Sequence, residues 1–396
     1  MTSIPQSALI SHLRDLIRID SRSNAAGGCE GPLQRQLAGY FERAGAQVRL
    51  LTIDDLPNLR KDPLFHGPTR DYSDRPTLIA EIGPADAPAL LLLAHSDTVP
   101  LFAPQEWTVD PFDAEMRDGR IYGLGSSDDK WGLACMMVLA EEFRAAHLKK
   151  RIILASTIDE ESGVGNGALI LARSGVRAEA ALYLDGMEMC VSRGNTGGST
   201  LSLAPDASIS VSQRQQDLLA LQRECTILST ERSHLFVQAG FADNWARDRS
   251  FITRGREDGT LPIAFYSLPG ETRSQMLKLL DGLLHNALEN RADEYRKSMR
   301  EPWFEAAITS PDLPLLSCIS EASTAVLRRD PIIGTTPKID AFVLTNHAKI
   351  PTLSFGCTAR TSGRGAFHEP DEYLTVEELT QAYAITHRTV ENWLRL

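Results

Sequence analysis

Histidines and carboxylates occur in five short segments of the 396-residue chain, and most of these segments directly follow an apolar run typical of a strand. The ligand-type residues are His95 and Asp97, Asp128 and Asp129, Asp159, Glu160 and Glu161, Asp185, and His368. Imidazole and carboxylate together suit borderline divalent ions such as Zn²⁺, Mn²⁺ and Co²⁺. Carboxylates crowded into a partly buried site stay charged only if cations compensate them. These residue types therefore predict a metal centre.

Each residue also has an ordinary interpretation. A histidine after a strand is commonly capped or solvated, a Glu-Glu pair commonly faces water, and Asp128 could simply N-cap the helix that follows it. The metal centre is favoured because several independent strand ends all supply ligand-type side chains. Agreement of all these positions by chance is much less probable than any single coincidence.

The elements that must position these residues alternate between two hydrophobic patterns. Spacing near 3.6 residues predicts helices over 7–19, 33–45, about 130–147 and 166–174. Apolar runs predict strands over 47–53, 76–82, 89–96, 151–159, 178–186 and 350–356. This βαβ series predicts a mainly parallel sheet flanked by helices. Ligands of such sheets bind beyond the carboxyl ends of the strands, where the histidines and carboxylates occur.

The hydrophobic pattern of the sequence changes at about residue 191 and returns to an αβ pattern after about residue 300. Periodicity between these points is weaker, but residues 261–288 contain a strand, a Pro-Gly turn and an amphipathic helix. We therefore predict an α/β catalytic domain formed by residues 1–190 and 301–396. A smaller α+β lid domain, residues 191–300, is inserted into it.

Composition excludes several classes of partner and environment. The formal charge is −11 without a long basic run, which disfavours nucleic acid as a partner. Apolar runs such as 89–94 fall far short of the roughly 20 residues that span a membrane. The first residues lack the apolar stretch of a signal peptide, and the six scattered cysteines form no CxxC pair. We expect a cytoplasmic protein with reduced thiols and a small-molecule substrate.

Five motifs, in order and at sensible spacing, resemble the co-catalytic zinc aminoacylase/carboxypeptidase family. That family includes acetylornithine deacetylase, succinyl-diaminopimelate desuccinylase and glutamate carboxypeptidase. The motifs are HSDTVP at 95–100, GLGSSDDKWG at 123–132, DEESG at 159–163, the strand end at Asp185, and FHEPDEYL at 367–374. The resemblance covers the whole predicted catalytic domain, and it implies a zinc-peptidase-like fold with one or two divalent ions per chain.

The resemblance also implies a role for each residue. Asp128 would bridge two metals, with a cis peptide bond to Asp129. The remaining ligands would be His95 and Asp185 on one metal, and Glu161 and His368 on the other. Asp97 would orient His95, because a ligating imidazole needs a partner on its other nitrogen. Glu160 would be the general base that takes a proton from the attacking water.

The inserted segment departs from the family pattern. The histidine that helps bind the oxyanion in relatives has no counterpart before His234, whose surroundings do not match, and Tyr266 and Ser267 stand where an arginine is common. The segment 191–300 has 12 Arg and 2 Lys against 13 Asp and Glu, so it is the less acidic part of the chain. We predict that one or more guanidinium groups bind a substrate carboxylate. The candidates are Arg193, Arg247, Arg249 and Arg254.

The predicted reaction is hydrolysis of a C–N amide bond in a small, carboxylate-bearing compound such as an N-acyl amino acid or a dipeptide. The unusual lid leaves open an aminohydrolase that releases ammonia from an amino-aromatic such as a nitroanthranilate. A non-catalytic binder on the same fold is a third possibility, against which the intact Glu160 argues. A homodimer through the lid is implied by the resemblance alone.

Overall fold

The computed structural model describes residues 5–144, 148–162, 165–358, 360 and 362–396. The chain forms two units. Unit 1 consists of Met1–Arg193, Thr309–Ile333 and Val343–Leu396, and unit 2 consists of Gly194–Ile308 and Gly334–Phe342. All the ligand-type residues from His95 to His368 lie in unit 1, so the candidate metal centre is a property of this unit alone.

Unit 1 is built on a mixed sheet whose centre is parallel. Its strands are ordered β10 (Val191–Asn195), β17 (Thr352–Phe355), β9 (Ala180–Tyr183), β5 (Ala89–His95), β8 (Arg151–Thr157), β4 (Thr77–Ile82) and β3 (Gln47–Leu51). Strands β17, β9, β5 and β8 run parallel, whereas β10, β4 and β3 pair antiparallel with their neighbours. The predicted fold class, a largely parallel sheet with a smaller second unit, is confirmed.

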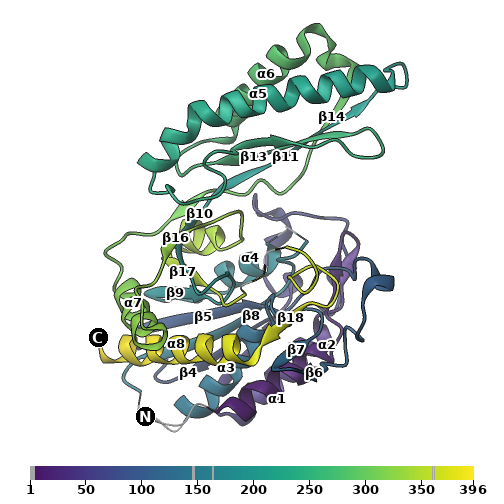
Figure 1. The fold of residues 1–396 in the computed structure, drawn as a ribbon. Coiled ribbons are helices and arrows are strands. Elements are labelled where there is room, and N and C mark those ends of the chain that lie inside the picture. The colour runs from purple at the N-terminus through teal and green to yellow at the C-terminus, as the bar shows by residue number, and fades with distance from the viewer. Residues whose placement is uncertain (1–4, 145–147, 163–164, 359, 361) are drawn as a thin grey trace. The chain divides into compact units, whose positions relative to one another are not determined.

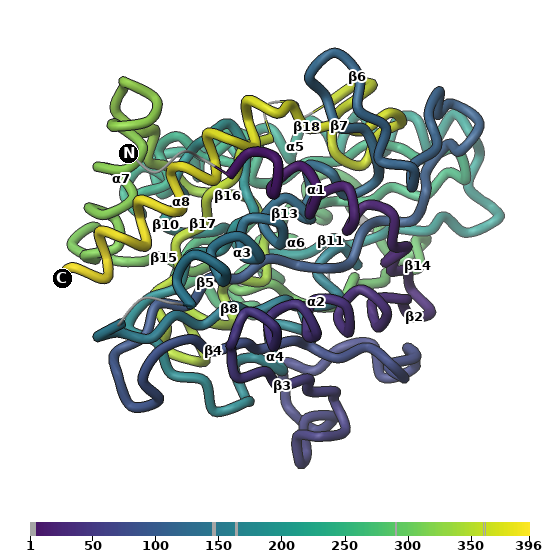
Figure 2. The backbone as a smooth tube through the Cα atoms, turned by 90° about the horizontal axis from the view of Figure 1, so that it is seen from below, coloured from purple at the N-terminus to yellow at the C-terminus, as the bar shows by residue number. Residues whose placement is uncertain are grey.

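Helices cover both faces of this sheet, as Figure 1 shows and as Figure 2 shows from below. One face packs against α1 (Gln6–Ile17), α2 (Gly31–Arg43), α3 (Lys130–Phe143), α7 (Pro314–Leu327) and α8 (Val376–Arg395). The other face meets α4 (Asn166–Arg173). Side chains of β5 alternate between the two faces, and Leu90 to Ala94 are all buried. This two-sided burial explains the uninterrupted apolar run that predicted the strand.

Short elements complete unit 1 around the sheet. They are β1 (Ser23–Asn24), β2 (Gly27–Gly28), β6 (Met116–Arg117), β7 (Arg120–Tyr122), β18 (Tyr373–Thr375) and the π-helical turn Val343–Ala348. Two further strands, β15 (Ala307–Ile308) and β16 (Ile333–Thr336), lie where the chain passes between the units. The helix predicted to about residue 147 ends at Phe143, and residues 145–147 lie outside the described part of the chain.

Unit 2 is an antiparallel sheet with two helices. The strand order is β12 (Phe251–Thr253), β13 (Leu261–Ser267), β11 (Gly197–Pro205) and β14 (Tyr295–Met299), and the helices are α5 (Val211–Gln238) and α6 (Arg273–Leu288). Helix α6 begins at a capping box in which Thr272 and Gln275 exchange hydrogen bonds. The predicted strand, turn and helix over 261–288 are present.

Helix α5 was not predicted, because its buried stripe is only half apolar. The stripe consists of Asp217, Leu221, Cys225, Ser229, Arg232 and Phe236. Its polar members have specific partners: the Tyr295 hydroxyl donates to Asp217 at 2.7 Å, and Arg232 pairs with Glu271 at 2.7 Å. Hydrophobic periodicity cannot detect a stripe whose burial depends on hydrogen bonds.

Two observations bear on the predicted environment. Within the described residues, no helix is both long and apolar enough to cross a membrane. All six cysteines lie in the described part of the chain, and none of them forms a disulfide.

Candidate metal centre

The centre begins with His95, the buried last residue of β5. Its Nδ1 donates a hydrogen bond to the backbone carbonyl of Asp97 at 2.9 Å, which leaves Nε2 to act as a ligand. This Nε2 lies 2.9 Å from the Oδ1 atom of Asp128. A neutral imidazole nitrogen and a carboxylate oxygen are both acceptors, so this close approach needs a proton or a cation between them.

Asp128 extends the centre to a second histidine. Its Oδ2 atom lies 3.2 Å from Nε2 of His368, while its Oδ1 faces His95. His368 in turn lies 2.8 Å from the carboxylate of Glu161. The peptide bond between Asp128 and Asp129 is cis. One carboxylate therefore spans two imidazoles, as a ligand that bridges two ions would.

Two overlapping groups of side chains present ligand atoms within 4.8 Å of one another. The first is His95, Asp128 and Glu161, and the second is His95, Glu160 and Asp185. The structure thus brings all the predicted ligands together, His368 included, and Glu160 lies beside them. The second group contains Glu160 rather than Asp128, which places the predicted base among atoms that could themselves hold an ion.

The charges of the centre favour the binding of cations. Burial, together with the negative charge of Asp128, raises the pKa of Glu161 to about 7. Burial opposes the charge of His368, but Asp128 and Glu161 outweigh it and raise the pKa of His368 to about 11. In both cases the carboxylates hold more negative charge than the protein compensates. The donor set and its charge fit one or two divalent ions.

The contacts of Asp97 differ from the expected role of its side chain, which was to orient His95. The backbone carbonyl of Asp97, not its carboxylate, accepts from His95, and the nearest carboxylate oxygen is 3.7 Å from Nδ1. The carboxylate instead accepts from the backbone amides of Glu160 at 3.1 Å and Glu161 at 3.0 Å. Ser23 donates its hydroxyl to the same carboxylate at 2.9 Å. The side chain of Asp97 therefore holds the turn that carries Glu160 and Glu161.

A buried ion-pair network supports the same turn, and sequence reasoning missed it. Asp159, which precedes Glu160, accepts from Arg70 at 2.5 Å, Arg75 at 3.0 Å and the Tyr72 hydroxyl at 2.9 Å. Arg75 also binds Glu30 through two hydrogen bonds, of 2.8 and 2.6 Å. Segment 70–75 has no helical or strand pattern. Its closely spaced charges, RDYSDR, were the one available signal, but their burial is not visible in the sequence.

Arg193 does not lie in a loop, as the sequence analysis expected. It is the third residue of β10, and its Nη1 atom donates to the carbonyl of Thr309 at 2.8 Å. The strand was missed because VSRGN has little β-branched or aromatic character, and its pairing depends on distant β17. The reason for choosing Arg193 is therefore weakened.

The other candidate substrate-binding residues belong to unit 2. Arg247 lies in a turn and pairs with Asp248 at 2.8 Å, whereas Arg249 and Arg254 are exposed. His234 is exposed on α5. Arg249 and Arg254 are thus better suited than Arg247 to bind an anion from solution.

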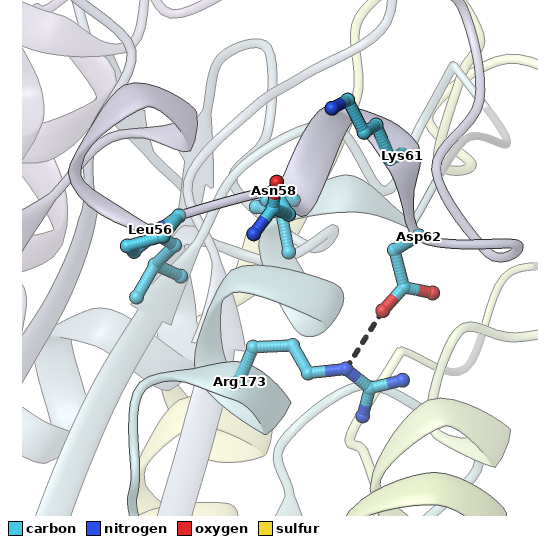
Figure 3. A pocket seen from close by; sticks show the side chains of 7 residues that line it. Leu56, Asn58, Lys61, Asp62 and Arg173 are labelled. Atoms are coloured by element: carbon cyan, nitrogen blue, oxygen red, sulfur yellow. Dashed lines mark hydrogen bonds and ion pairs between the residues drawn. The ribbon is translucent and has the colours of Figure 1, made fainter.

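A separate pocket of about 400 Å³ lies in unit 1, between segment 56–62 and α4 (Figure 3). Its charged lining residues are Lys61, Asp62 and Arg173, and Arg173 donates to Asp62 at 2.8 Å. This ion pair offsets the charge of Arg173 within the protein. The pocket shares no lining residue with the metal centre.

The family of the chain follows from comparison with known sequences. The profile of Peptidase family M20/M25/M40 matches residues 91–392. Succinyl-diaminopimelate desuccinylase from Xanthomonas oryzae pv. oryzae (strain MAFF 311018) is 35% identical over 173 residues, which cover 43% of this chain and 38% of the relative. The same enzyme from Methylobacterium sp. (strain 4-46) is 26% identical over 392 residues, which cover 91% of each protein. The first relative is therefore matched over less than half of its own length.

Solved structures share the fold. The M20 family metallo-carboxypeptidase Sso-CP2 from Sulfolobus solfataricus has a TM-score of 0.71 at 15% identity, covering 98% of this chain and 99% of that chain. The Bacillus subtilis YXEP protein, described as a dinuclear metal-binding peptidase, has a TM-score of 0.58 at 16% identity and 98% coverage of both chains. The chain belongs to the M20/M25/M40 peptidase family.

Proposed function

We propose that this member of the M20/M25/M40 family hydrolyses the amide bond of a small, carboxylate-bearing substrate, such as an N-acyl amino acid or a dipeptide. The observation that carries the proposal is the Asp128 carboxylate, which lies 2.9 Å from His95 and 3.2 Å from His368. The proposed ligands are His95, Asp128, Glu161, Asp185 and His368. Homology to succinyl-diaminopimelate desuccinylases supports an N-acylated, anionic substrate.

The site residues divide the chemistry among them. When bound, Zn²⁺, Mn²⁺ or Co²⁺ would polarise the scissile carbonyl and lower the pKa of the attacking water. Glu160 would take the proton of that water and deliver it to the leaving nitrogen. The Asp97 carboxylate, which accepts from the Glu160 amide at 3.1 Å, would keep this base at a fixed position. Glu160 would thus carry out the proton transfer, and Asp97 would hold it in position.

The second candidate is an aminohydrolase that displaces ammonia from an amino-aromatic. It is favoured by two departures of the inserted domain from the family pattern. His234, whose surroundings do not match the pattern, is exposed on α5, and Tyr266 of β13 stands where an arginine is common. Incubation with N-acyl amino acids, dipeptides and amino-aromatics separates the candidates. A released acyl acid or amino acid supports amide hydrolysis, whereas free ammonia supports the aminohydrolase. Tight binding without turnover in the ion-loaded protein would instead support a binder.

Two further proposals concern the state of the protein in the cell. A cytoplasmic location is supported by the six cysteines, none of which is in a disulfide. A homodimer through unit 2 is supported by large apolar side chains that are exposed on α5, such as Leu219 at 66% and Val237 at 53%. Sedimentation of the purified protein tests the dimer.

Removal of divalent ions is expected to abolish hydrolysis. The reason is that His95, Asp128, Glu161 and His368 place imidazole and carboxylate groups within 2.9, 3.2 and 2.8 Å of one another, and these groups are the ligands that hold such ions. Chelator-treated protein should be inactive, and Zn²⁺, Mn²⁺ or Co²⁺ should restore turnover. Metal analysis must accompany the assay, since full activity in verified ion-free protein would contradict the proposal.

Replacement of Arg249 or Arg254 by alanine is expected to raise KM for a carboxylated substrate. Hydrogen bonds to a charged group contribute about 1.5–3 kcal/mol, so the correct variant should show an increase of roughly tenfold or more. Amidation of the substrate carboxylate should produce the same loss in the unmodified enzyme. Arg223→Ala is the control, because this side chain is 79% exposed on α5. Equal turnover of neutral and carboxylated substrates would remove the anion-binding role.

A further inference from the structure

We infer that Glu372 is a positioning residue that fixes Asp128 between the two histidines, an inference that rests on the proposed metal centre. Glu372 is 1% exposed and immediately precedes β18. Its Oε2 accepts from the amide of Gly125 at 3.0 Å. Its Oε1 accepts from both the amide and the hydroxyl of Ser127, each at 2.9 Å. Both carboxylate oxygens thus bind the loop that ends at Asp128.

The backbone of this loop is fixed at further points. The Gly123 amide donates to the carbonyl of Glu372 at 2.9 Å, and the Thr358 hydroxyl donates to the carbonyl of Ser127 at 2.7 Å. Gly125 has a φ of +79°, and a Cβ atom there would lie 2.5 Å from the Thr98 side chain. The loop therefore has little freedom, and the position of Ser127 sets that of the adjacent Asp128.

Glu372 also belongs to the segment that carries the second histidine. His368 lies four residues before it, and the neighbouring Asp371 accepts from the amide and hydroxyl of Thr108 at 2.7 and 2.8 Å. Glu372 consequently joins the loop of Asp128 to the segment of His368. The 3.2 Å approach between Asp128 and His368 requires both segments to be held in register.

A carboxylate is needed here, not just any polar residue. Burial raises the pKa of Glu372 to about 7, while the Gly125 and Ser127 donors favour the charged form. Those donors need acceptors on both oxygens. Glutamine would offer one acceptor and turn an NH₂ group towards a backbone N–H, so at least one buried donor would lose its partner. The expected consequence is a displaced loop, not simply a weaker fold.

The test is ion binding by Glu372→Gln, measured as Co²⁺ titration of ion-free protein with the visible spectrum of the bound ion as the signal. Partners that orient metal ligands typically change metal affinity by about 10- to 100-fold, and we expect a weakening of that size with an altered spectrum. Asp371→Asn is the matched control, because Asp371 is buried in the same segment but binds Thr108 rather than the Asp128 loop. This control should lose stability without the same spectral change.

A milder variant keeps the inference testable if Glu372→Gln does not fold. Ser127→Ala removes one hydroxyl donor and leaves both amide bonds to Glu372 intact, and it should weaken Co²⁺ binding by several-fold. Wild-type affinity and spectrum in a folded Glu372→Gln protein, or a Ser127→Ala effect confined to thermal stability, would overturn the positioning role. Failure of the unmodified protein to bind Co²⁺ would instead overturn the proposed metal centre.

Discussion

Glu160→Gln is expected to reduce kcat by about 10²- to 10⁴-fold, the contribution typical of a general base, while the bound ions are retained. Glutamine has nearly the shape of glutamate but cannot accept a proton at neutral pH. The backbone amide of Glu160, which donates to Asp97 at 3.1 Å, is unaffected by the substitution. The turn should therefore keep its position while proton transfer is lost.

The neighbouring Glu161 provides the sharpest comparison. Its side chain is 5% exposed and lies 2.8 Å from His368, so Glu161→Gln should lower ion content as well as activity. Glu369→Gln serves as the silent control, because Glu369 is exposed in the segment of His368. Steady-state kinetics and metal analysis on the same protein samples distinguish a base from a ligand.

The opposite outcome has a structural basis that the experiment can detect. Glu160, His95 and Asp185 present ligand atoms within 4.8 Å of one another, so Glu160 has the surroundings of a possible ligand. If Glu160→Gln lost an ion and its residual activity followed occupancy, the roles of Glu160 and Glu161 would be reversed.

The sequence could predict the features that local pattern determines. Strands such as β5 and β8 are buried on both faces, so their composition is apolar throughout and their ends are easily located. His95 is the last residue of β5 and Glu160 lies shortly after the end of β8, and parallel pairing of β5 with β8 brings the two ends to one edge of the sheet. The convergence of candidate ligands was predictable because it needed only strand positions and a parallel order.

Features that depend on contacts between distant residues could not be predicted. The family resemblance implied that Asp97 is the partner of His95, but only the folded turn makes its carbonyl the acceptor and leaves its carboxylate to accept from the amide of Glu161. The hydrogen bond between Glu372 and Ser127 joins positions that are 245 residues apart, and the one between Arg75 and Asp159 joins positions that are 84 residues apart. Each of these buried charges has a partner that no local pattern identifies.

Asp128→Asn is expected to have the broadest effect, because Asp128 is the side chain that contacts both histidines. Asparagine retains one acceptor, but its NH₂ group would face an imidazole nitrogen, and the negative charge between His95 and His368 would be lost. Ion affinity and activity should both fall by more than the roughly 10- to 100-fold typical of residues that merely orient ligands.

Thermal unfolding tests Asp128→Asn without an activity assay. An ion present at 100 times its Kd stabilises the folded state by about 2.7 kcal/mol, since it binds only that state. The unmodified protein should therefore gain melting temperature on addition of Zn²⁺ or Mn²⁺, as should the control Asp86→Asn, whose residue is exposed between β4 and β5. The Asp128→Asn protein should gain little. An undiminished ion-dependent shift in that variant would mean that the ions are held without Asp128, and the two histidines would then have to belong to separate sites rather than to one bridged centre.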